Sequence, residues 1–393
     1  MQGGRGEIGR GAMANGSDES SATPVWPPIH RLTHDGRSGE LFVIFLVNLA
    51  LSILTLGIYR FWGRTRIRRY VWSQTSLLGE PLEYTGRGIE LFLGFLFAIA
   101  LIYGPIIGLF FQRGGEIPDL GLDPLPEAVA VLGEFFLILL AATPILVLFY
   151  YVALFAAYRY RISRTSWLGI RGGMEGSAWS YGVLGLFYGF MNAITLGWTK
   201  PWADSVVFKY RLSRIWFGNE IFESQLDATG LYSRFTLAWI GTAVATVASI
   251  AAFGFLLESN PDLFRNPTPA TSWRLNTIAT AIYLFPLIVY QLLICAYKAA
   301  LVRNIAKRLT FGPVSFRADV TFKDVFRLRI PNILLMVFSL GFAYPYVVMR
   351  TTRFITQHVQ FHGDIRTAAI GQSEIEAPRY GEGLMEFFGI GMI

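Results

Sequence analysis

Long apolar stretches separated by short polar loops dominate the chain from about residue 40 onwards. Some of these stretches reach the length of about 20 residues that a helix needs to cross a bilayer. The candidate spans are residues 89–111, 131–157, 231–257 and about 276–300. This pattern predicts a polytopic helical membrane protein.

Three further apolar segments are shorter or interrupted by glycine, and each ends in a related phrase. The segments are residues 40–57, 179–197 and 328–341. The phrases are "TLGIYRFW" from Thr55, "TLGWTKPW" from Thr195 and "SLGFAYPY" from Ser339. Their glycines lie 140 and 144 residues apart, and a long fixed period of this kind indicates internal repeats. We expect these segments either to cross the membrane or to enter and leave it on one side.

Each of the three segments carries polar residues at equal offsets before its glycine. Spacings of four and three residues put the polar positions of one segment on one helical face. Such a face is unfavourable in lipid unless it contacts protein, water or a ligand. The pattern predicts a shared hydrated path lined by Asn48, Ser52, Thr55, Asn192, Thr195, Asn332 and Ser339.

Short strand pairs around a glycine turn lie between the predicted helices. The clearest is "TSLLGEPLEYTG", which starts at Thr75, and similar turns start at Thr165, Ile215 and Leu309. We expect small β-hairpins that cap the helices. The predicted fold class is therefore mostly α: a polytopic helical membrane protein built from pseudo-repeats of about 140 residues, with short β-hairpins on the cytoplasmic face.

The repeats also suggest domain boundaries. Residues 30–175 form the first predicted membrane repeat, residues 176–323 the second, and residues 324–363 a partial third. Residues 1–29 are rich in Gly, Ser and Glu and contain no apolar core, which predicts a disordered tail rather than a cleaved signal peptide. Residues 364–393 are predicted to be a C-terminal cytoplasmic tail.

The composition favours membrane lipids over nucleic acid as partners. Hydrophobic residues make up 53% of the chain and charged residues 16%, whereas soluble domains contain about 25% charged residues. The net charge is +7, but the arginines lie beside apolar runs among Trp and Tyr, as at a membrane–water interface. A small-molecule solute and a homo-oligomer are both compatible with the sequence.

Basic residues follow the TLG phrases closely. They are predicted to contact an anionic solute or lipid headgroups, although an ordinary stop-transfer signal with an aromatic belt explains the same pattern. The residues singled out are Arg60, Arg64, Arg66 and Lys200.

The basic residues also predict orientation. If only the four long segments cross, three of the 34 Lys and Arg residues face outward, and both termini are cytoplasmic. If all seven segments cross, the repeats are inverted and the basic loops 198–230 and 298–330 lie outside. The positive-inside rule favours the four-span arrangement, although it places Arg60 and Lys200 close to the membrane.

With these motifs in hand, the chain resembles the YjgN family of bacterial inner-membrane proteins. The similarity runs from about Arg31 to the C-terminus and includes the "TSWLGI" hairpin, the closing "GEGLMEFF" and the TLG-x-x-x-P-W phrase. Phe61 replaces the usual proline in the first copy, and Tyr346 replaces tryptophan in the third. The resemblance implies a fold and an inner-membrane location. It supplies no catalytic residues.

Enzymatic motifs are not found. The single cysteine, Cys295, excludes an internal disulfide, and no phosphate loop, nucleophile elbow or H-E-x-x-H motif occurs. Two i, i+4 histidine pairs are weak metal-site candidates that require the two ends of the chain to meet: His30, His34, His358 and His362. We predict a protein that is not an enzyme, with no metal and no cofactor.

Two functions from different classes remain. The favoured one is transport or permeation of a small, anionic solute through the inner membrane, because broken, polar-striped segments at corresponding positions are typical of transporter sites. The alternative is a non-transporting scaffold or lipid-organising protein.

Overall fold

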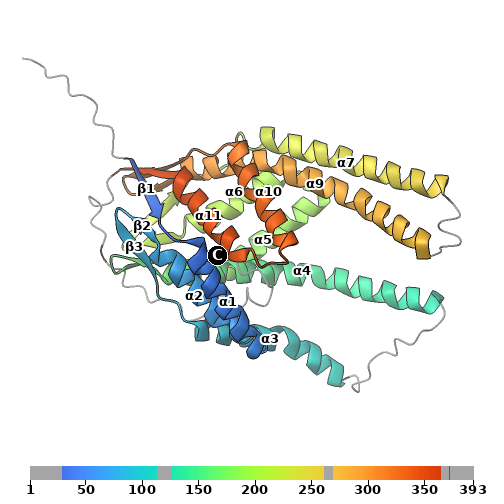
Figure 1. Cartoon of the computed structure of the whole chain (residues 1–393), viewed down its shortest axis with the longest axis horizontal. Coiled ribbons are helices and arrows are strands. Elements are labelled where there is room, and N and C mark those ends of the chain that lie inside the picture. Colours follow the sequence, from blue (N-terminus) through green and yellow to red (C-terminus); the bar gives the residue numbers. More distant parts are fainter. Residues whose placement is uncertain (1–28, 113–124, 261–268, 364–370, 372–393) are drawn as a thin grey trace, which may run out of the picture.

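The computed structural model describes residues 29–112, 125–260, 269–363 and residue 371. Within these residues, short strands gather at one end of the molecule, and the longest helices extend away from them towards the other end (Figure 1). The predicted tail at residues 1–29 lies outside the described residues except for Ile29. The predicted tail at residues 364–393 lies outside them except for Gly371.

Ten strands form one closed antiparallel barrel. Around the ring the order is β1-β10-β9-β8-β7-β6-β5-β4-β3-β2, and β2 returns to β1. The strands are β1 (Ile29–His34), β2 (Thr75–Leu77), β3 (Glu80–Tyr84), β4 (Thr165–Trp167), β5 (Ile170–Met174), β6 (Ile215–Phe217), β7 (Glu220–Ser224), β8 (Leu309–Phe311), β9 (Val314–Ala318) and β10 (Val359–His362).

The expected fold class, a mostly α polytopic membrane protein with short β-hairpins that cap its helices, is wrong, because the hairpins belong to one closed barrel. The four predicted hairpins exist as β2–β3, β4–β5, β6–β7 and β8–β9, but each pairs with the next around the ring. Closure comes from β1 and β10, where Ile29 lies opposite His362. The physical reason is that a hairpin of three- and five-residue strands is unstable alone, whereas a closed ring leaves no unpaired edge.

Three pairs of short helices, none longer than 17 residues, form helix–turn–helix arms. The TLG phrases form the turns of these arms. We call these arm 1, arm 2 and arm 3. Arm 1 is α1 (Ser38–Leu54) with α2 (Arg60–Ser73), arm 2 is α5 (Ala178–Ile194) with α6 (Lys200–Leu212), and arm 3 is α10 (Phe322–Phe338) with α11 (Tyr344–His358).

The remaining helices are long and join the other strands of the barrel. They are α3 (Gly88–Gln112), α4 (Leu125–Ser163), α7 (Tyr232–Ser259) and α9 (Pro269–Lys307). By length and composition, the described residues contain three candidate membrane spans, Ala142–Ser163, Tyr232–Ser259 and Ser272–Lys307. The sequence predicted four spans. The predicted span at residues 89–111 is not among the three, because only Gly88–Phe97 of α3 counts as an apolar helix, and it is shorter than a span.

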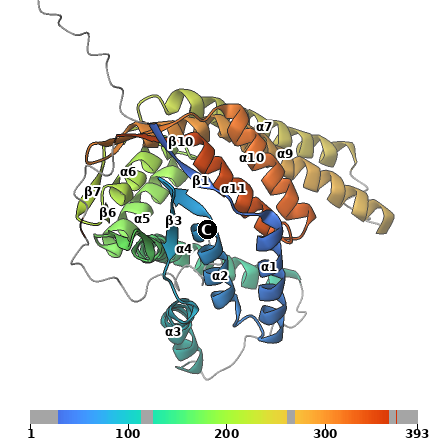
Figure 2. The ribbon, with the colours of Figure 1, turned by 60° about the vertical axis from the view of Figure 1, so that its left-hand side comes forward.

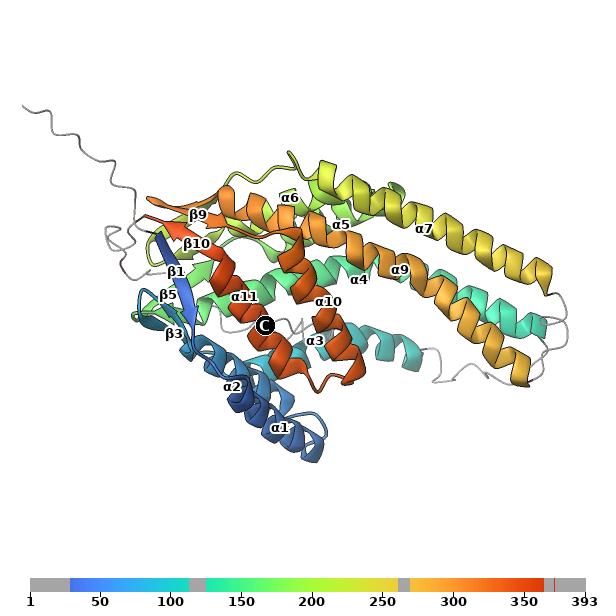
Figure 3. The same cartoon turned by 45° about the horizontal axis from the view of Figure 1, so that its top comes forward.

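All helix pairs start and finish at the same barrel. Figure 3 shows α4, α7 and α9 leaving it in one direction, with the arms nearer to the strands. A pair that leaves the ring must return to the same side, because its flanking strands are hydrogen-bonded into that ring. The seven-crossing alternative, which puts some hairpins on opposite sides of the membrane, conflicts with this geometry.

The arms pack against each other and against the long helices. Phe45 of α1 lies with its ring 6.5 Å from that of Phe342 and 6.2 Å from that of Tyr344, so arm 1 contacts the turn of arm 3 (Figure 2). Phe61, which occupies the usual proline position, is 1% exposed in a cluster with Leu91 and Tyr160. A first-turn helical position tolerates proline without requiring it, so the aromatic residue serves packing instead.

The predicted repeat boundaries stay a prediction. Strands from residues 30–175, 176–323 and 324–363 alternate with helix pairs in one barrel, so these segments share a common core.

Candidate lipid-facing site

The three TLG turns share one geometry. In each, the hydroxyl that precedes the Leu-Gly pair accepts a hydrogen bond from the backbone N–H four residues later. The distances are 2.9 Å from Tyr59 to Thr55, 3.3 Å from Thr199 to Thr195, and 2.9 Å from Ala343 to Ser339. This bond joins the end of the first helix to the start of the second, which explains why Thr or Ser stands at this position.

A leucine at the tip of each arm has an unusual backbone. Leu56, Leu196 and Leu340 have φ of 51°, 50° and 50°, in the left-handed region. That conformation is unfavourable for an L-residue by about 1–2 kcal/mol. These side chains are nevertheless 94%, 81% and 90% exposed. A leucine side chain this exposed gains little from burial within the chain, but it gains apolar contact when the tip is immersed in acyl chains.

The predicted path-lining asparagines contact their own arms. Asn48 is 5% exposed and donates to the Gly63 carbonyl over 3.1 Å, which joins α1 to α2. Asn192 accepts from the Thr199 hydroxyl at 2.7 Å, across the turn of arm 2. Asn332 accepts from Arg350 at 3.1 Å.

The smaller predicted path residues behave in the same way. Thr55, Thr195 and Ser339 cap the turns, and Ser52 lies half-buried in α1. The structure therefore gives each stripe a partner within one arm. A shared path stays a prediction.

The predicted basic residues separate into different environments. Arg60 is exposed and holds its guanidinium 4.7 Å from the ring centre of Phe95, a cation–π contact between arm 1 and α3. Lys200 pairs with Asp204 at 3.0 Å, and the same carboxylate accepts from the Tyr297 hydroxyl at 2.6 Å. Arg64 is half-buried. These residues are not brought together at one site.

Arg66 lines a cavity of about 480 Å³ between α2 and the start of α3, which we call the arginine pocket. Its polar and charged lining comes from three arginines with Thr65, and its aromatic lining from Tyr59 and Trp62, whose rings stack 6.4 Å apart. The lining residues are Tyr59, Trp62, Thr65, Arg66, Arg69, Arg87, Gly88 and Ile89.

The charge of the arginine pocket is not neutralised locally. Arg69 donates to the Gly86 carbonyl, whereas Arg66 and Arg87 have no carboxylate partner among the described residues. The nearby Glu90 is already paired with Arg164 at 2.9 Å and accepts from the Tyr160 hydroxyl. A cationic pocket with an aromatic wall suits a phosphate headgroup whose acyl chains enter the bilayer.

Sequence reasoning missed Arg87. Arg87 stands in the motif "TGRGIELF", two residues before the apolar run that begins at residue 89. A basic residue at the start of an apolar helix is typical of the membrane interface, so this position could have indicated the role of Arg87. Its proximity to α2 depends on Gly88, where a side chain would clash with Trp62 at 2.7 Å. That contact could not be read from spacing.

A second basic cavity, of about 260 Å³, lies between the helices of arm 3. There Arg350 is bound to Asn332 and to the Arg327 carbonyl, and Asp324 contributes a negative charge. The hydrogen bonds of Arg350 and the charge of Asp324 leave this cavity less suited to an anion. The arginine pocket is therefore the stronger headgroup candidate.

The histidines do not form a cluster, although the two ends of the chain do meet. The ring of His30 packs 5.5 Å from that of Phe361, His34 bonds the Thr75 hydroxyl, and His358 bonds a backbone carbonyl. No group of three or more His, Cys, Asp and Glu side chains suited to a metal occurs in the described parts of the chain.

Comparison with known proteins agrees with the membrane character of this site. The sequence from residue 29 to residue 387 matches the family described as a bacterial protein of unknown function, DUF898. This chain belongs to that family. The match covers the barrel and all of the helices described above.

Its curated relatives are named inner membrane protein YjgN, so the resemblance to that family is confirmed. The protein from Salmonella typhimurium LT2 is 35% identical over 103 residues, 26% of this chain and 25% of the relative. The one from Escherichia coli K12 is 32% identical over 72 residues, 18% of each chain. The matched segments thus span a quarter or less of these relatives' length. No solved structure matches the chain.

Proposed function

We propose that this inner-membrane protein organises lipids and does not transport a solute. In this proposal the barrel lies at the cytoplasmic surface, and the long helices cross the membrane in pairs. The three arms enter one leaflet and return, and the arginine pocket holds anionic headgroups beside arm 1. The excess of Lys and Arg near the barrel side favours a cytoplasmic location for it.

The exposed tip leucines carry this proposal. Moving one leucine side chain from water into an apolar medium is favourable by about 1.5–3 kcal/mol, enough to offset the left-handed backbone. Three tips with the same turn and the same exposed leucine act together as wedges in one leaflet. The polar stripes then serve to hold each arm closed, in agreement with the hydrogen bonds of Asn48, Asn192 and Asn332.

The chain offers a matched control for this idea. Leu168, in the β4–β5 turn, has φ of 52°, precedes a glycine and is 60% exposed, like the tip leucines, but it lies on the barrel. Asparagine adopts the left-handed region more readily than leucine, so Leu→Asn removes apolar surface without straining the backbone.

The test is the triple variant Leu56→Asn, Leu196→Asn and Leu340→Asn in proteoliposomes, with spin-labelled lipids reporting the fraction immobilised at the protein. We expect the triple variant to immobilise fewer lipids and Leu168→Asn to match the unmodified protein. Equal lipid immobilisation in all three proteins, each with unchanged thermal unfolding, would contradict the wedge role.

The arginine pocket has its own test. Arg66→Gln with Arg87→Gln should abolish the preference for spin-labelled phosphatidylglycerol over phosphatidylcholine. Arg317→Gln is the control, because Arg317 is exposed on β9 away from the pocket and pairs with Asp319. An unchanged lipid preference in the pocket variant would remove the headgroup assignment.

Transport of a small anionic solute is the second candidate. One observation favours it: two cations from neighbouring helices are held against the candidate span α9. Arg329 of α10 donates to Gln291 of α9 at 2.6 Å. Lys200 of α6 pairs with Asp204, whose carboxylate accepts from Tyr297 of α9. Anion flux into proteoliposomes above that of empty vesicles, lost in Lys200→Gln, would favour transport over lipid organisation.

A further inference from the structure

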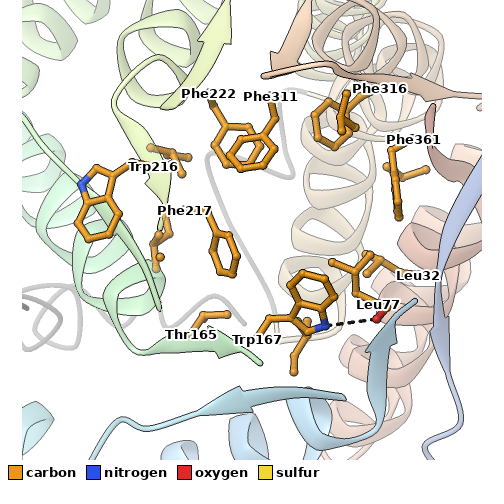
Figure 4. A pocket seen from close by; sticks show the side chains of 16 residues that line it. Leu32, Leu77, Thr165, Trp167, Trp216, Phe217, Phe222, Phe311, Phe316 and Phe361 are labelled. Atoms are coloured by element: carbon orange, nitrogen blue, oxygen red, sulfur yellow. Dashed lines mark hydrogen bonds between the residues drawn. The ribbon is translucent and has the colours of Figure 1, made fainter. Parts of the chain in front are cut away.

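The inside of the barrel is an apolar cavity of about 320 Å³. Figure 4 shows aromatic and aliphatic side chains from strands all around the ring pointing towards it. Alternate residues of single strands face inward, such as Ile215 with Phe217 and Val314 with Phe316, as the two-residue period of a strand requires.

The wall of this cavity offers almost no hydrogen bonds. Apart from the indoles of Trp167 and Trp216, the polar side chain among the lining residues is Thr165, whose hydroxyl already bonds the Arg161 carbonyl and the Trp72 indole. The indole nitrogen of Trp216 has no hydrogen-bond partner among the described residues, and it lies on the side of the ring that faces away from the cavity (Figure 4). The indole of Trp167 donates to the Leu77 carbonyl at 3.2 Å (Figure 4). A polar occupant would lose its hydrogen bonds to water without replacement, so the cavity selects an apolar one.

The chain returns to the rim of this cavity after its last strand. The backbone N–H of Gly371 donates to Asn219 Oδ1 over 3.1 Å, and Asn219 lies in the β6–β7 turn. Phe217, two residues before Asn219, is part of the cavity wall. Gly371 therefore lies beside the barrel.

The last ten residues of the sequence suit an apolar cavity. The sequence "LMEFFGIGMI", from Leu384 to Ile393, has Glu386 as its one charged side chain and two adjacent phenylalanines, Phe387 and Phe388. Leu384 lies 13 positions after Gly371, and an extended chain of that length spans about 43 Å. This exceeds the length of the barrel strands, which at five residues are about 17 Å long.

We propose that the C-terminal segment 384–393 covers the barrel, with the side chains of Phe387 and Phe388 inside the cavity and Glu386 outside it. A segment tethered to the rim has an effective concentration of about a millimolar at the cavity, which a free fatty acyl chain must compete against. Binding there also covers aromatic surface that would otherwise contact water. The inference is independent of the lipid-organising function, because it involves neither the arms nor the arginine pocket.

A cross-linking experiment tests it in the full-length protein, in a Cys295→Ala background. Phe388→Cys is combined either with Leu77→Cys, inside the barrel, or with Leu168→Cys, on an exposed barrel turn. We expect a short bismaleimide to give an intramolecular product at least ten times more abundant for the first pair. Equal yields, or none for the first pair, overturn the proposal.

A second measurement does not depend on introduced cysteines. Phe387→Asp with Phe388→Asp should lower Tm by about 2–4 °C or more, because charged side chains cannot replace phenylalanine in the cavity, whereas Glu386→Gln should leave Tm unchanged. A photoactivatable fatty acid should label the barrel wall only in the double variant. Equal labelling of the unmodified protein and the double variant would identify an acyl chain as the natural occupant of the cavity. It would refute the proposal that the C-terminal segment binds there.

Discussion

The indole N–H of Trp239 donates to the Leu196 carbonyl over 2.9 Å, which fixes the turn of arm 2 to the candidate span α7. The rings of Trp239 and Trp198 also meet edge to face, 5.2 Å apart. Trp239 lies seven residues after the first residue of α7, about 10 Å along the helix axis. In the arrangement proposed above, α7 crosses a hydrocarbon core about 30 Å thick, and this contact then sets the turn of arm 2 within one leaflet.

This depth can be measured directly. With Cys295→Ala, a fluorophore on Leu196→Cys should be quenched more by lipids that carry a nitroxide midway along the acyl chain than by lipids labelled at the headgroup. The reference is a fluorophore on Leu168→Cys, which lies on the barrel and which the acyl-chain label should not quench. Strongest quenching of the Leu196→Cys fluorophore by the headgroup label would contradict this depth, because it places the turn at a membrane surface.

The sidedness of the barrel gives a second prediction. Cysteines placed in the four hairpin turns, at Leu78, Leu168, Asn219 and Pro313, should all react with an impermeant maleimide from the same side, because one closed ring contains them all. Inverted vesicles should show labelling and intact cells none. The seven-crossing arrangement requires Leu78 and Leu168 to react from the side opposite to Asn219 and Pro313.

A third prediction concerns the buried Asn48. Asn48→Ala removes the hydrogen bond to the Gly63 carbonyl and leaves a gap where the two helices approach closely, since a side chain at Gly63 would lie 3.1 Å from Asn48. We expect the free energy of unfolding in detergent to fall by about 1–3 kcal/mol. Ser52→Ala, half-buried in the same helix, should change it by about 0.5 kcal/mol or less. Similar losses in both variants would contradict a specific inter-helix role for Asn48.

The barrel seam predicts a pH dependence. Burial lowers the pKa of His34 below its ordinary value of 6.5, and the positive charge of Arg353 acts in the same direction, while Asp35 opposes it. The folded state thus prefers neutral His34. The stability that this residue contributes is complete above pH 6.5 and is lost as the pH falls through the lowered folded-state pKa.

Thermal unfolding between pH 7.5 and 5 measures this effect. His34→Gln should reduce the fall in Tm over that range, and Thr33→Ser, a non-titratable change in the same strand, should not. An identical pH profile for His34→Gln and the unmodified protein would show that other groups cause the loss.

Much of the local structure was predictable because it depends on neighbours in sequence. The glycine turns at Thr75, Thr165, Ile215 and Leu309 are hairpins, and the three TLG segments end in turns. The spans at 231–257 and 276–300 were also located correctly. These features follow from short-range periodicity and from positive φ at Leu-Gly pairs.

Barrel closure was not predictable in the same way. It pairs β1 with β10, more than 320 residues apart, and three-residue strands such as β2 carry too few positions to define a partner. The long helices also continue beyond the predicted spans: α4 runs to Ser163, because it must reach the barrel after leaving the apolar region.

The candidate site was likewise predictable where it depends on neighbours in sequence and unpredictable where it depends on long-range packing. Arg66 was found because it follows a conspicuous aromatic and basic run, but its pocket requires Arg87 from a different helix pair. The asparagines were recognised as buried polar groups. Their partners, such as Gly63 and Thr199, depend on how each arm folds back on itself.

The pairing of Ile29 with His362 has a consequence for synthesis of the protein. Until residue 362 has left the ribosome, four finished hairpins stand at the membrane with two open strand edges. Those edges are competent to pair with another nascent chain. Biogenesis must therefore hold a partly assembled ring apart from its neighbours until the final strand arrives.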